Sequence, residues 1–267
     1  MNFKALIAAG ALLATQSFAI VGLGFHYAPG LGTKMNGMPA PANVAPGVDF
    51  QHEGFDGLMQ GFGFKLWVDL LPVIDIEATL NVQFGSYDAT LYVDGADPLP
   101  LEIELAGTPF AKANPKFVAM TGDLSITYPI TTLPIIRPYI GGGLSYHMNS
   151  FILNQKFMTG LMQKETVHSI ITGDAVTEAA EAVAMGMTPE QYANEKAKKL
   201  KQEVQDYAIK EGLNSSIGGH ILVGLRAKLP IIPIAAYSNF KYYIGGDYPD
   251  EIDAGNMTVE VGVGLAI

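Results

Sequence analysis

Apolar and polar residues alternate along several stretches of this chain. From Ile74 to Gly85, the even-numbered positions carry Ile, Ile, Ala, Leu, Val and Phe, and the odd-numbered positions carry Asp, Glu, Thr, Asn, Gln and Gly. Successive side chains of a β-strand point to opposite faces, so this stretch predicts a strand with one apolar and one polar face. Seven further segments show the pattern: residues 21–27, 61–70, 118–128, 136–148, 217–229, 234–244 and 257–267.

The polar face of these segments consists largely of glycine, small residues and charges of both signs. A sheet face that is open to water carries few glycines, whereas the inside of a narrow barrel has little room for side chains. A tilted strand crosses a bilayer with about 9–11 residues, which is close to the length of these segments. The pattern therefore predicts an all-β fold, an eight-stranded antiparallel up-and-down transmembrane β-barrel. A soluble β-sandwich or barrel is the alternative.

The connections between the segments are of two kinds. Three are short and contain proline, at Leu71–Ile74, Leu133–Ile136 and Leu229–Ile234. Proline cannot donate to a strand ladder, so it is typical of turns and strand ends. Short turns at one end and long loops at the other are typical of outer-membrane barrels, with both termini on the periplasmic side. The long connections are residues 28–56, 86–115, 150–215 and 245–256.

The third extracellular loop, residues 151–216, contains a helical insertion. Ala175–Ala184 is rich in Ala, Glu and Val, and a second helix is expected from Thr188, with Pro189 at its first position, to Glu211. We expect a helical hairpin that packs on itself over the barrel mouth; a lid or partner-binding arm is the alternative. One apolar stripe marks the second helix: Ala193, Ala197, Leu200, Val204 and Tyr207.

The N-terminus has the layout of a secretory signal peptide. Lys4 precedes a short apolar run, and Ser17-Phe18-Ala19 places small residues two apart before a cleavage point. We expect residues 1–19 to be removed, so that residues 20–267 form the mature barrel. This apolar run is too short to span a bilayer as a helix, and no later stretch offers the roughly 18 uninterrupted apolar residues of a transmembrane helix.

Composition narrows the possible functions. The chain has no cysteine, so disulfides cannot stabilise it after export. A net charge of −10 argues against a nucleic-acid partner, because phosphate binding needs a basic surface. No paired-histidine helix or phosphate-binding glycine loop is present, and we expect no cofactor.

Charged residues on the polar faces would project into the lumen, five basic and five acidic. Unpaired charges in a narrow lumen are costly, so we expect them to pair and fill it. A narrow polar conduit for ions or small solutes is the alternative. These residues form the predicted lumen network: Lys65, Asp69, Asp75, Glu77, Asp123, Arg137, Arg226, Lys228, Lys241 and Glu260.

Two further groups of residues carry side chains that are capable of chemistry. Ser145 and His147 share an inward face, as do His26 and His220, but no nucleophile motif surrounds them, and we expect no enzymatic activity. The fourth long loop contains acidic residues without a base. They are weak candidates for a divalent cation and lack the spacing of a calcium loop: Asp247, Asp250, Glu251 and Asp253.

The segment Arg137-Pro138-Tyr139-Ile140-Gly141-Gly142-Gly143-Leu144 resembles the Pro-Tyr-x-Gly-x-Gly strand of small outer-membrane barrels of the OmpA and OmpX kind. The glycine-alternating strand Val259–Ile267 is a second match. The resemblance implies a location in the outer membrane of a Gram-negative envelope, contact with its lipid, and assembly by the export and barrel-assembly machinery. Family members usually end in an aromatic residue, whereas this chain ends in Ile267.

The resemblance and the loop pattern favour a structural or surface-interaction role, with specificity for a surface ligand or protein in the extracellular loops. A narrow pore or a transport protein for ions, small solutes or apolar molecules is the alternative.

Overall fold

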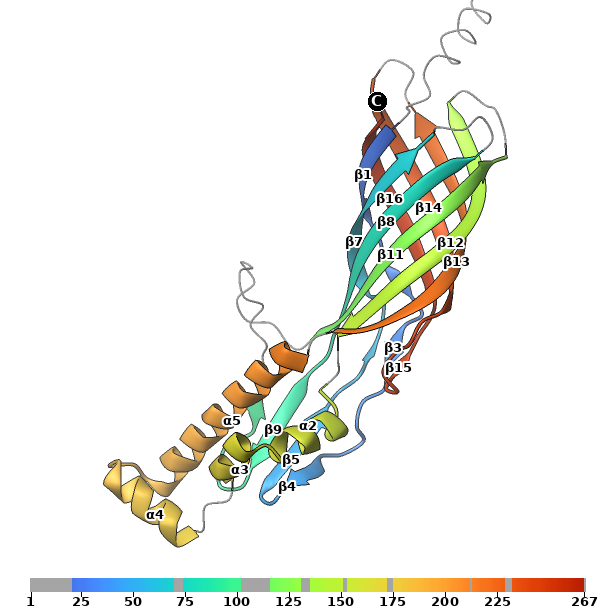
Figure 1. Cartoon of the computed structure of the whole chain (residues 1–267). Coiled ribbons are helices and arrows are strands. Elements are labelled where there is room, and N and C mark those ends of the chain that lie inside the picture. Colours follow the sequence, from blue (N-terminus) through green and yellow to red (C-terminus); the bar gives the residue numbers. More distant parts are fainter. Residues whose placement is uncertain are drawn as a thin grey trace, which may run out of the picture.

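A closed antiparallel β-barrel forms the centre of the computed structural model, which describes residues 21–69, 74–101, 116–130, 135–150, 153–171, 175–211, 213–228 and 232–266. Neighbouring barrel strands follow the chain order, and the last strand pairs with the first (Figure 1). The predicted eight-stranded barrel is confirmed. Its strands are β1 (Val21–Tyr27), β7 (Gln60–Val68), β8 (Asp75–Ser86), β11 (Lys116–Pro129), β12 (Ile136–Ser150), β13 (Leu213–Lys228), β14 (Ile234–Gly245) and β16 (Met257–Ala266).

Exposure alternates along the barrel strands as the sequence pattern predicts. Phe25 and Val263, which pair across β1 and β16, point outward and are 51% and 60% exposed. Lys65 and Glu260 point inward and are fully buried. The wall is therefore apolar on the outside and polar on the inside, the reverse of a soluble protein and the arrangement of a barrel in a bilayer.

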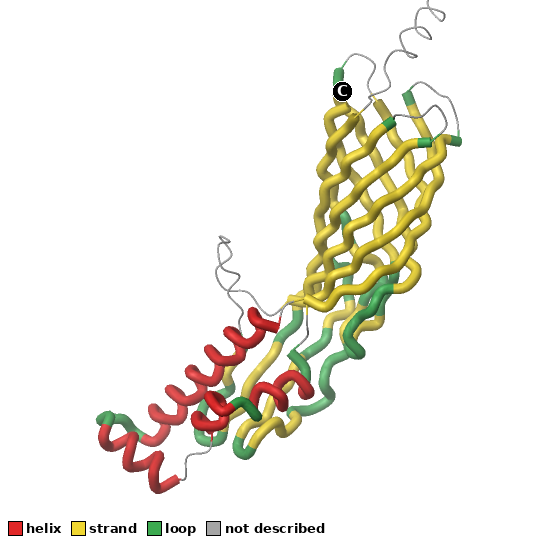
Figure 2. The backbone as a smooth tube through the Cα atoms, in the orientation of Figure 1, coloured by secondary structure: helices red, strands yellow, loops and turns green. Residues whose placement is uncertain are grey.

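The two ends of the barrel differ. Val21 and Ala266 lie at one end, here called the terminal end, and long connections leave the opposite loop end (Figure 2). At the terminal end, the last paired residues are Val68 opposite Ile76 in the β7–β8 pair and Lys228 opposite Ala235 in the β13–β14 pair. The expected signal peptide, residues 70–73, 131–134 and 229–231 of the proline turns, and Ile267 lie outside the described residues.

The first two long connections form a second sheet beyond the loop end. Its four strands pair in the order β10-β9-β5-β4. Their bounds are β4 (Ala42–Ala45), β5 (Val48–His52), β9 (Ala89–Val93) and β10 (Leu99–Pro100). Short strands near the barrel mouth join the first and fourth connections to each other and to the barrel: β2 (Gly30–Leu31), β3 (Lys34–Met35), β6 (Phe55–Asp56) and β15 (Ile252–Asp253).

The third connection is helical, with α2 (Gln155–Met162), α3 (Glu165–Ile171), α4 (Ala175–Ala184) and α5 (Pro189–Glu211). The two expected helices are confirmed. A capping box starts α5, since the backbone N–H of Gln191 donates to Thr188 Oγ1 at 3.2 Å and the Gln191 side chain accepts from the N–H of Thr188 at 2.9 Å. Helices α2 and α3 were not foreseen.

The two expected helices contact each other, as a hairpin requires, and the helical segment also packs on the second sheet. α2 contacts β4 and β5, and α5 contacts β9, β10 and α3 as well as α4. We call the assembly of β4, β5, β9, β10 and α2–α5 the loop unit. Its hydrophobic core continues to the barrel mouth through Met35, Met59 and Phe117. Within the loop unit these core side chains are at most 1% exposed: Val48, Phe50, Leu91, Leu153, Met158, Leu161, Val167, Leu200 and Val204.

Candidate functional site: the barrel lumen and the loop unit

The charged lumen residues nearest the terminal end form one ion-pair cluster. Arg226 on β13 donates to Asp69 Oδ1 at 2.9 Å and to Glu77 Oε1 at 2.5 Å. Glu77 also binds Lys65 Nζ, at 2.6 Å. Arg137 joins the cluster through Asp69 at 3.5 Å and through Asp75 at 3.2 Å.

A second cluster lies nearer the loop end. Lys241 Nζ stands 2.8 Å from Asp123 Oδ2 and 2.7 Å from Glu260 Oε1, and all three side chains are shielded from solvent. Asn81 and Asn239 donate to the two oxygens of Glu260, at 2.8 and 2.7 Å. A carboxylate can accept several hydrogen bonds, and the Lys241 ammonium supplies only part of them for Glu260. The two amides supply further donors.

Aromatic side chains pack against the charged clusters. Tyr139 accepts from Lys65 Nζ at 2.9 Å and donates to Asn239 Oδ1 at 2.5 Å, so it links the first cluster to the second. The Arg226 guanidinium lies 4.9 Å from the ring centre of Trp67, within cation–π range. Trp67 is 1% exposed and packs edge-on against Tyr237 at 5.8 Å.

The structure thus places nine of the ten predicted network residues in two ion-paired clusters. Lys228, at the terminal end of β13, is half-buried and interacts electrostatically with Asp69. The sequence interpretation did not include the uncharged members Asn81 and Asn239. Both occupy inward positions of alternating segments, a signal that could have identified them.

The serine and histidine candidates lie in the same interior. Ser145 Oγ donates to Asp123 Oδ1 at 2.8 Å and stands 2.9 Å from His220 Nδ1, while Ser125 Oγ stands 2.8 Å from His220 Nε2. The side chains are at most 4% exposed, so a substrate has no access to them in this conformation. His147 lies apart from this group, 3.4 Å from Thr121 Oγ1.

His26 adjoins the second cluster through Asn81. Its ring nitrogens stand 2.9 Å from Tyr237 Oη and 2.6 Å from Asn81 Oδ1. His26, His147 and His220 are at most 3% exposed, so none of these three lumen histidines stands at an open surface.

The acidic residues of the fourth connection are divided among different contacts. Glu251 accepts from Asn154 Nδ2 at 2.6 Å, and Asp253 pairs with Lys34 in the β15–β3 ladder. The described residues contain no cluster of three or more His, Cys, Asp or Glu side chains able to hold a metal ion.

A polar junction joins all four long connections. His52 comes from the first, Tyr87 from the second, Asn154 from the third and Glu251 from the fourth. The Tyr87 hydroxyl accepts from the backbone N–H of Leu153 at 3.2 Å, and the His52 ring meets the Tyr87 ring edge-on at 6.2 Å. Burial lowers the pKa of His52 and raises that of Tyr87, because each charged form would lose its hydration.

A closed eight-stranded barrel with an apolar outer wall, a polar interior and long connections at one end is the architecture of small outer-membrane β-barrel proteins. Among the described residues, no helix is long and apolar enough to cross a membrane. No protein-family model and no curated protein matches the sequence.

Several solved structures of outer-membrane proteins are similar in fold. OprG from Pseudomonas aeruginosa matches at 9% identity and a TM-score of 0.44, over 93% of this chain and 96% of that one. Neisserial surface protein A matches at 11% identity and a TM-score of 0.41, over 92% and 97%. The attachment invasion locus protein Ail of Yersinia pestis matches at 8% identity and a TM-score of 0.40, over 93% and 98%. At these values the likeness says nothing about a shared activity.

Proposed function

We propose that this chain is an exported outer-membrane protein whose barrel is a sealed anchor and whose loop unit presents a surface for interaction. Residues 1–19 act as a cleaved signal peptide, and the barrel-assembly machinery inserts residues 20–267. The terminal end faces the periplasm and the loop unit faces outward, in accord with the topology of such barrels.

The observation that carries the sealed barrel is the bridge across the lumen made by Lys241. Asp123 on β11 and Glu260 on β16 stand four places apart in the ring of eight strands, on opposite walls. Lys241 Nζ contacts both carboxylates, at 2.8 and 2.7 Å. Because a buried charge that loses its partner is strongly destabilising, thermal motion does not readily open this bridge for a solute.

Single-channel recording in planar bilayers tests the seal. The wild-type protein is expected to give no defined conductance steps. The combined variant Lys241→Ala, Asp123→Ala, Glu260→Ala removes the bridge without leaving one charge unpaired within it, and small steps are expected to appear. Regular steps from the wild-type protein would favour the narrow-pore alternative.

The observation that supports an interaction role is the core of the loop unit. Long connections without a core sample many conformations, whereas side chains such as Phe50, Leu91 and Leu200 fix these connections in one arrangement. A surface ordered before binding loses less entropy when it binds. The loop unit is therefore suited to recognising a partner outside the membrane.

A glycan and protein array tests this role, with the full chain in detergent and a variant in which a Gly/Ser linker replaces residues 153–211. A ligand bound by the full chain and lost in the variant supports the proposal. A ligand retained equally by both forms would place recognition outside the helical part.

A further inference from the structure

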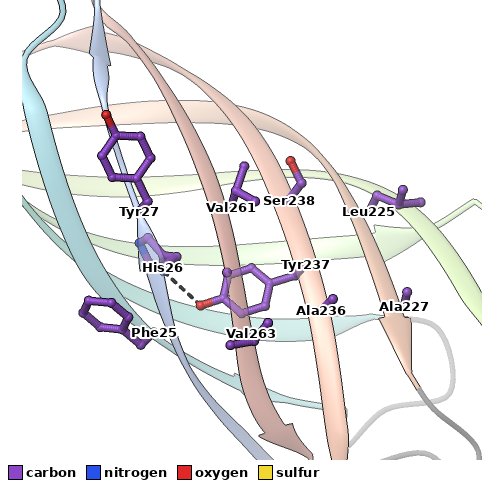
Figure 3. Close-up of a pocket in the computed structure, with 11 residues that line it drawn as sticks. Phe25, His26, Tyr27, Leu225, Ala227, Ala236, Tyr237, Ser238, Val261 and Val263 are labelled. Atoms are coloured by element: carbon purple, nitrogen blue, oxygen red, sulfur yellow. Dashed lines mark hydrogen bonds between the residues drawn. The ribbon is translucent and has the colours of Figure 1, made fainter.

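The outer wall of the barrel carries a groove of about 560 Å³ over β1, β13, β14 and β16 (Figure 3). Its lining includes the outward-facing side chains of Phe25, Tyr27, Leu225 and Val261. A second hollow of about 390 Å³ lies nearer the terminal end, among Leu23, Ile234 and Leu265, and shares Phe25 and Val263 with the first. We call the two hollows together the wall furrow.

The furrow exists because small residues interrupt the apolar outer wall. Ala227 and Ala236 pair across β13 and β14, and Ser238 follows on the outward side of β14. Figure 3 shows the two alanines side by side, with the rings of Phe25 and Tyr27 on the other side of the groove. Outward positions of β13 and β14 outside the groove carry larger residues, such as Val223, Phe240 and Tyr242.

The position of the furrow restricts what can occupy it. Leu23, Ile234 and Leu265 lie close to the ends of their strands at the terminal end. In a bilayer this part of the wall contacts the hydrocarbon of the periplasmic leaflet, so the occupant must be apolar. A second protein chain would need a broad contact of about 1,000 Å² or more, whereas the furrow is narrow and rimmed by the bulky Phe25 and Leu225.

We propose that the wall furrow is a binding site for one acyl chain of a phospholipid in the periplasmic leaflet. An acyl chain is thin, flexible and wholly apolar, and it gains dispersion contacts when it enters a groove that other wall atoms surround. A chain held between Phe25, Val263 and Ala236 exchanges more slowly than the lipid around the rest of the wall.

The protein contains a reporter for this site. Trp67 is the single tryptophan of the sequence, and it lies inside the barrel directly behind the furrow. A β-carbon on Gly264, which lines the furrow, would lie only 2.8 Å from Cη2 of Trp67. Little more than the glycine backbone therefore separates the indole from a bound chain.

Quenching of Trp67 fluorescence by phospholipids with brominated acyl chains tests the proposal in bilayers of mixed composition. In the wild-type protein, we expect strong quenching at a low fraction of brominated lipid. Ala236→Leu fills the groove with a side chain that suits the lipid-facing wall, and it is expected to weaken the quenching. Ser238→Leu is a second filling variant, should the first fail to assemble.

Ala78→Leu is the matched control. Ala78 also faces outward, on β8, between Leu66 and Leu124 and away from the furrow. It is expected to leave the quenching unchanged. Equal quenching in the wild-type protein and both filling variants would overturn the proposal. A second outcome would also overturn it. If quenching of the wild-type protein falls as its density in the membrane rises, and dimers form at the same time, then the furrow holds a second copy of the chain.

Discussion

At the scale of single residues, the barrel interior depends on glycines that face aromatic rings. Gly22 and Gly264 leave space for Trp67, and Gly24 and Gly262 leave space for Tyr237. The glycines lie on β1 and β16, the two strands that close the barrel. Closure and filling of the lumen are therefore linked, because a larger residue on either strand would displace a ring that plugs the interior.

Gly24→Ala tests this relation. A β-carbon on Gly24 would lie 2.6 Å from the Tyr237 ring, so we expect a loss of about 1–3 kcal/mol in the free energy of unfolding, as for an overpacked core. Gly122→Ala is the control, since a β-carbon there meets no atom within 4 Å. Urea unfolding in detergent micelles measures both. Equal stability of the two variants would contradict the packing argument.

Glu77→Ala tests the ion-pair cluster. It leaves Lys65 and Arg226 buried without their shared carboxylate, and removal of one member of a buried pair costs about 3–5 kcal/mol. Asp56→Ala breaks the exposed pair with Lys34, which is 3.4 Å long, and should cost less than about 1 kcal/mol. The same unfolding assay compares them, and a small effect of Glu77→Ala would show that water reaches the cluster.

The inward direction of these charges could be predicted from the sequence, because alternation is a local property of a strand. Their partners could not. Lys65 and Glu77 come from adjacent strands, but Asp123 and Glu260 come from opposite walls, and a contact between such positions depends on the stagger of the closed barrel. Alternation in residues 136–148 gives no indication that Tyr139 links the two clusters.

At the scale of elements, α5 holds the loop unit together. Leu200 is 1% exposed in its core, whereas Val183 on α4 is 77% exposed. Leu200→Ala should destabilise the loop unit by about 2–5 kcal/mol through the cavity it leaves, and Val183→Ala should have little effect. Limited proteolysis is expected to cut the loop unit faster in Leu200→Ala while the barrel remains intact. Equal cleavage of both variants would contradict a shared core.

The loop unit should also respond to acid. His52 Nδ1 is buried and has no hydrogen-bond partner among the described residues, and burial lowers the pKa of this imidazole below its ordinary value of 6.5. At a pH between the lowered pKa of the folded state and the ordinary pKa of the unfolded state, the unfolded chain binds more protons than the folded one. The stability that neutral His52 gives the folded state is therefore fully present above about pH 6.5. It decreases as the pH falls below that value.

Amide hydrogen exchange of β5 and β9 at pH 7.5 and pH 5, corrected for intrinsic rates, measures this response. Protection is expected to decrease at the lower pH in the wild-type protein and to change less in His52→Gln. The carboxylate of Glu251 and the backbone carbonyl of Glu53 act in the opposite direction, since both favour the charged imidazole. An equal loss of protection in both proteins would assign the response to other groups.

The elements that could be predicted are those with long or capped patterns. The barrel strands have enough residues for alternation to be recognised, and α5 has Pro189 at its start. Helices α2 and α3 have eight and seven residues, too few for a helical period to stand out. The strands β4, β5 and β9 are also short, and β5 pairs with β9 across two separate connections. Long-range pairing of this kind has no local signature.

At the scale of the whole molecule, the apolar wall makes the protein dependent on a membrane or detergent. The folded barrel in detergent is expected to migrate differently on a denaturing gel before and after boiling, because the closed ladder resists unfolding at room temperature. A chain that stays soluble without detergent would contradict the transmembrane assignment.

The lengths of the barrel strands differ around the ring. β13 has 16 residues and β12 has 15, whereas β1 has seven. A tilted strand needs about 9–11 residues to cross the hydrocarbon, so the β12–β13 hairpin has about five residues to spare, or roughly 16 Å at 3.3 Å a residue. The far end of this hairpin carries Asn214, Ser215 and Ser216 opposite Asn149, Met148 and His147. In the proposed topology, the extra length makes the hairpin a stalk on one side of the rim. It would hold the loop unit above the lipid headgroups, within reach of large molecules that do not penetrate the membrane surface.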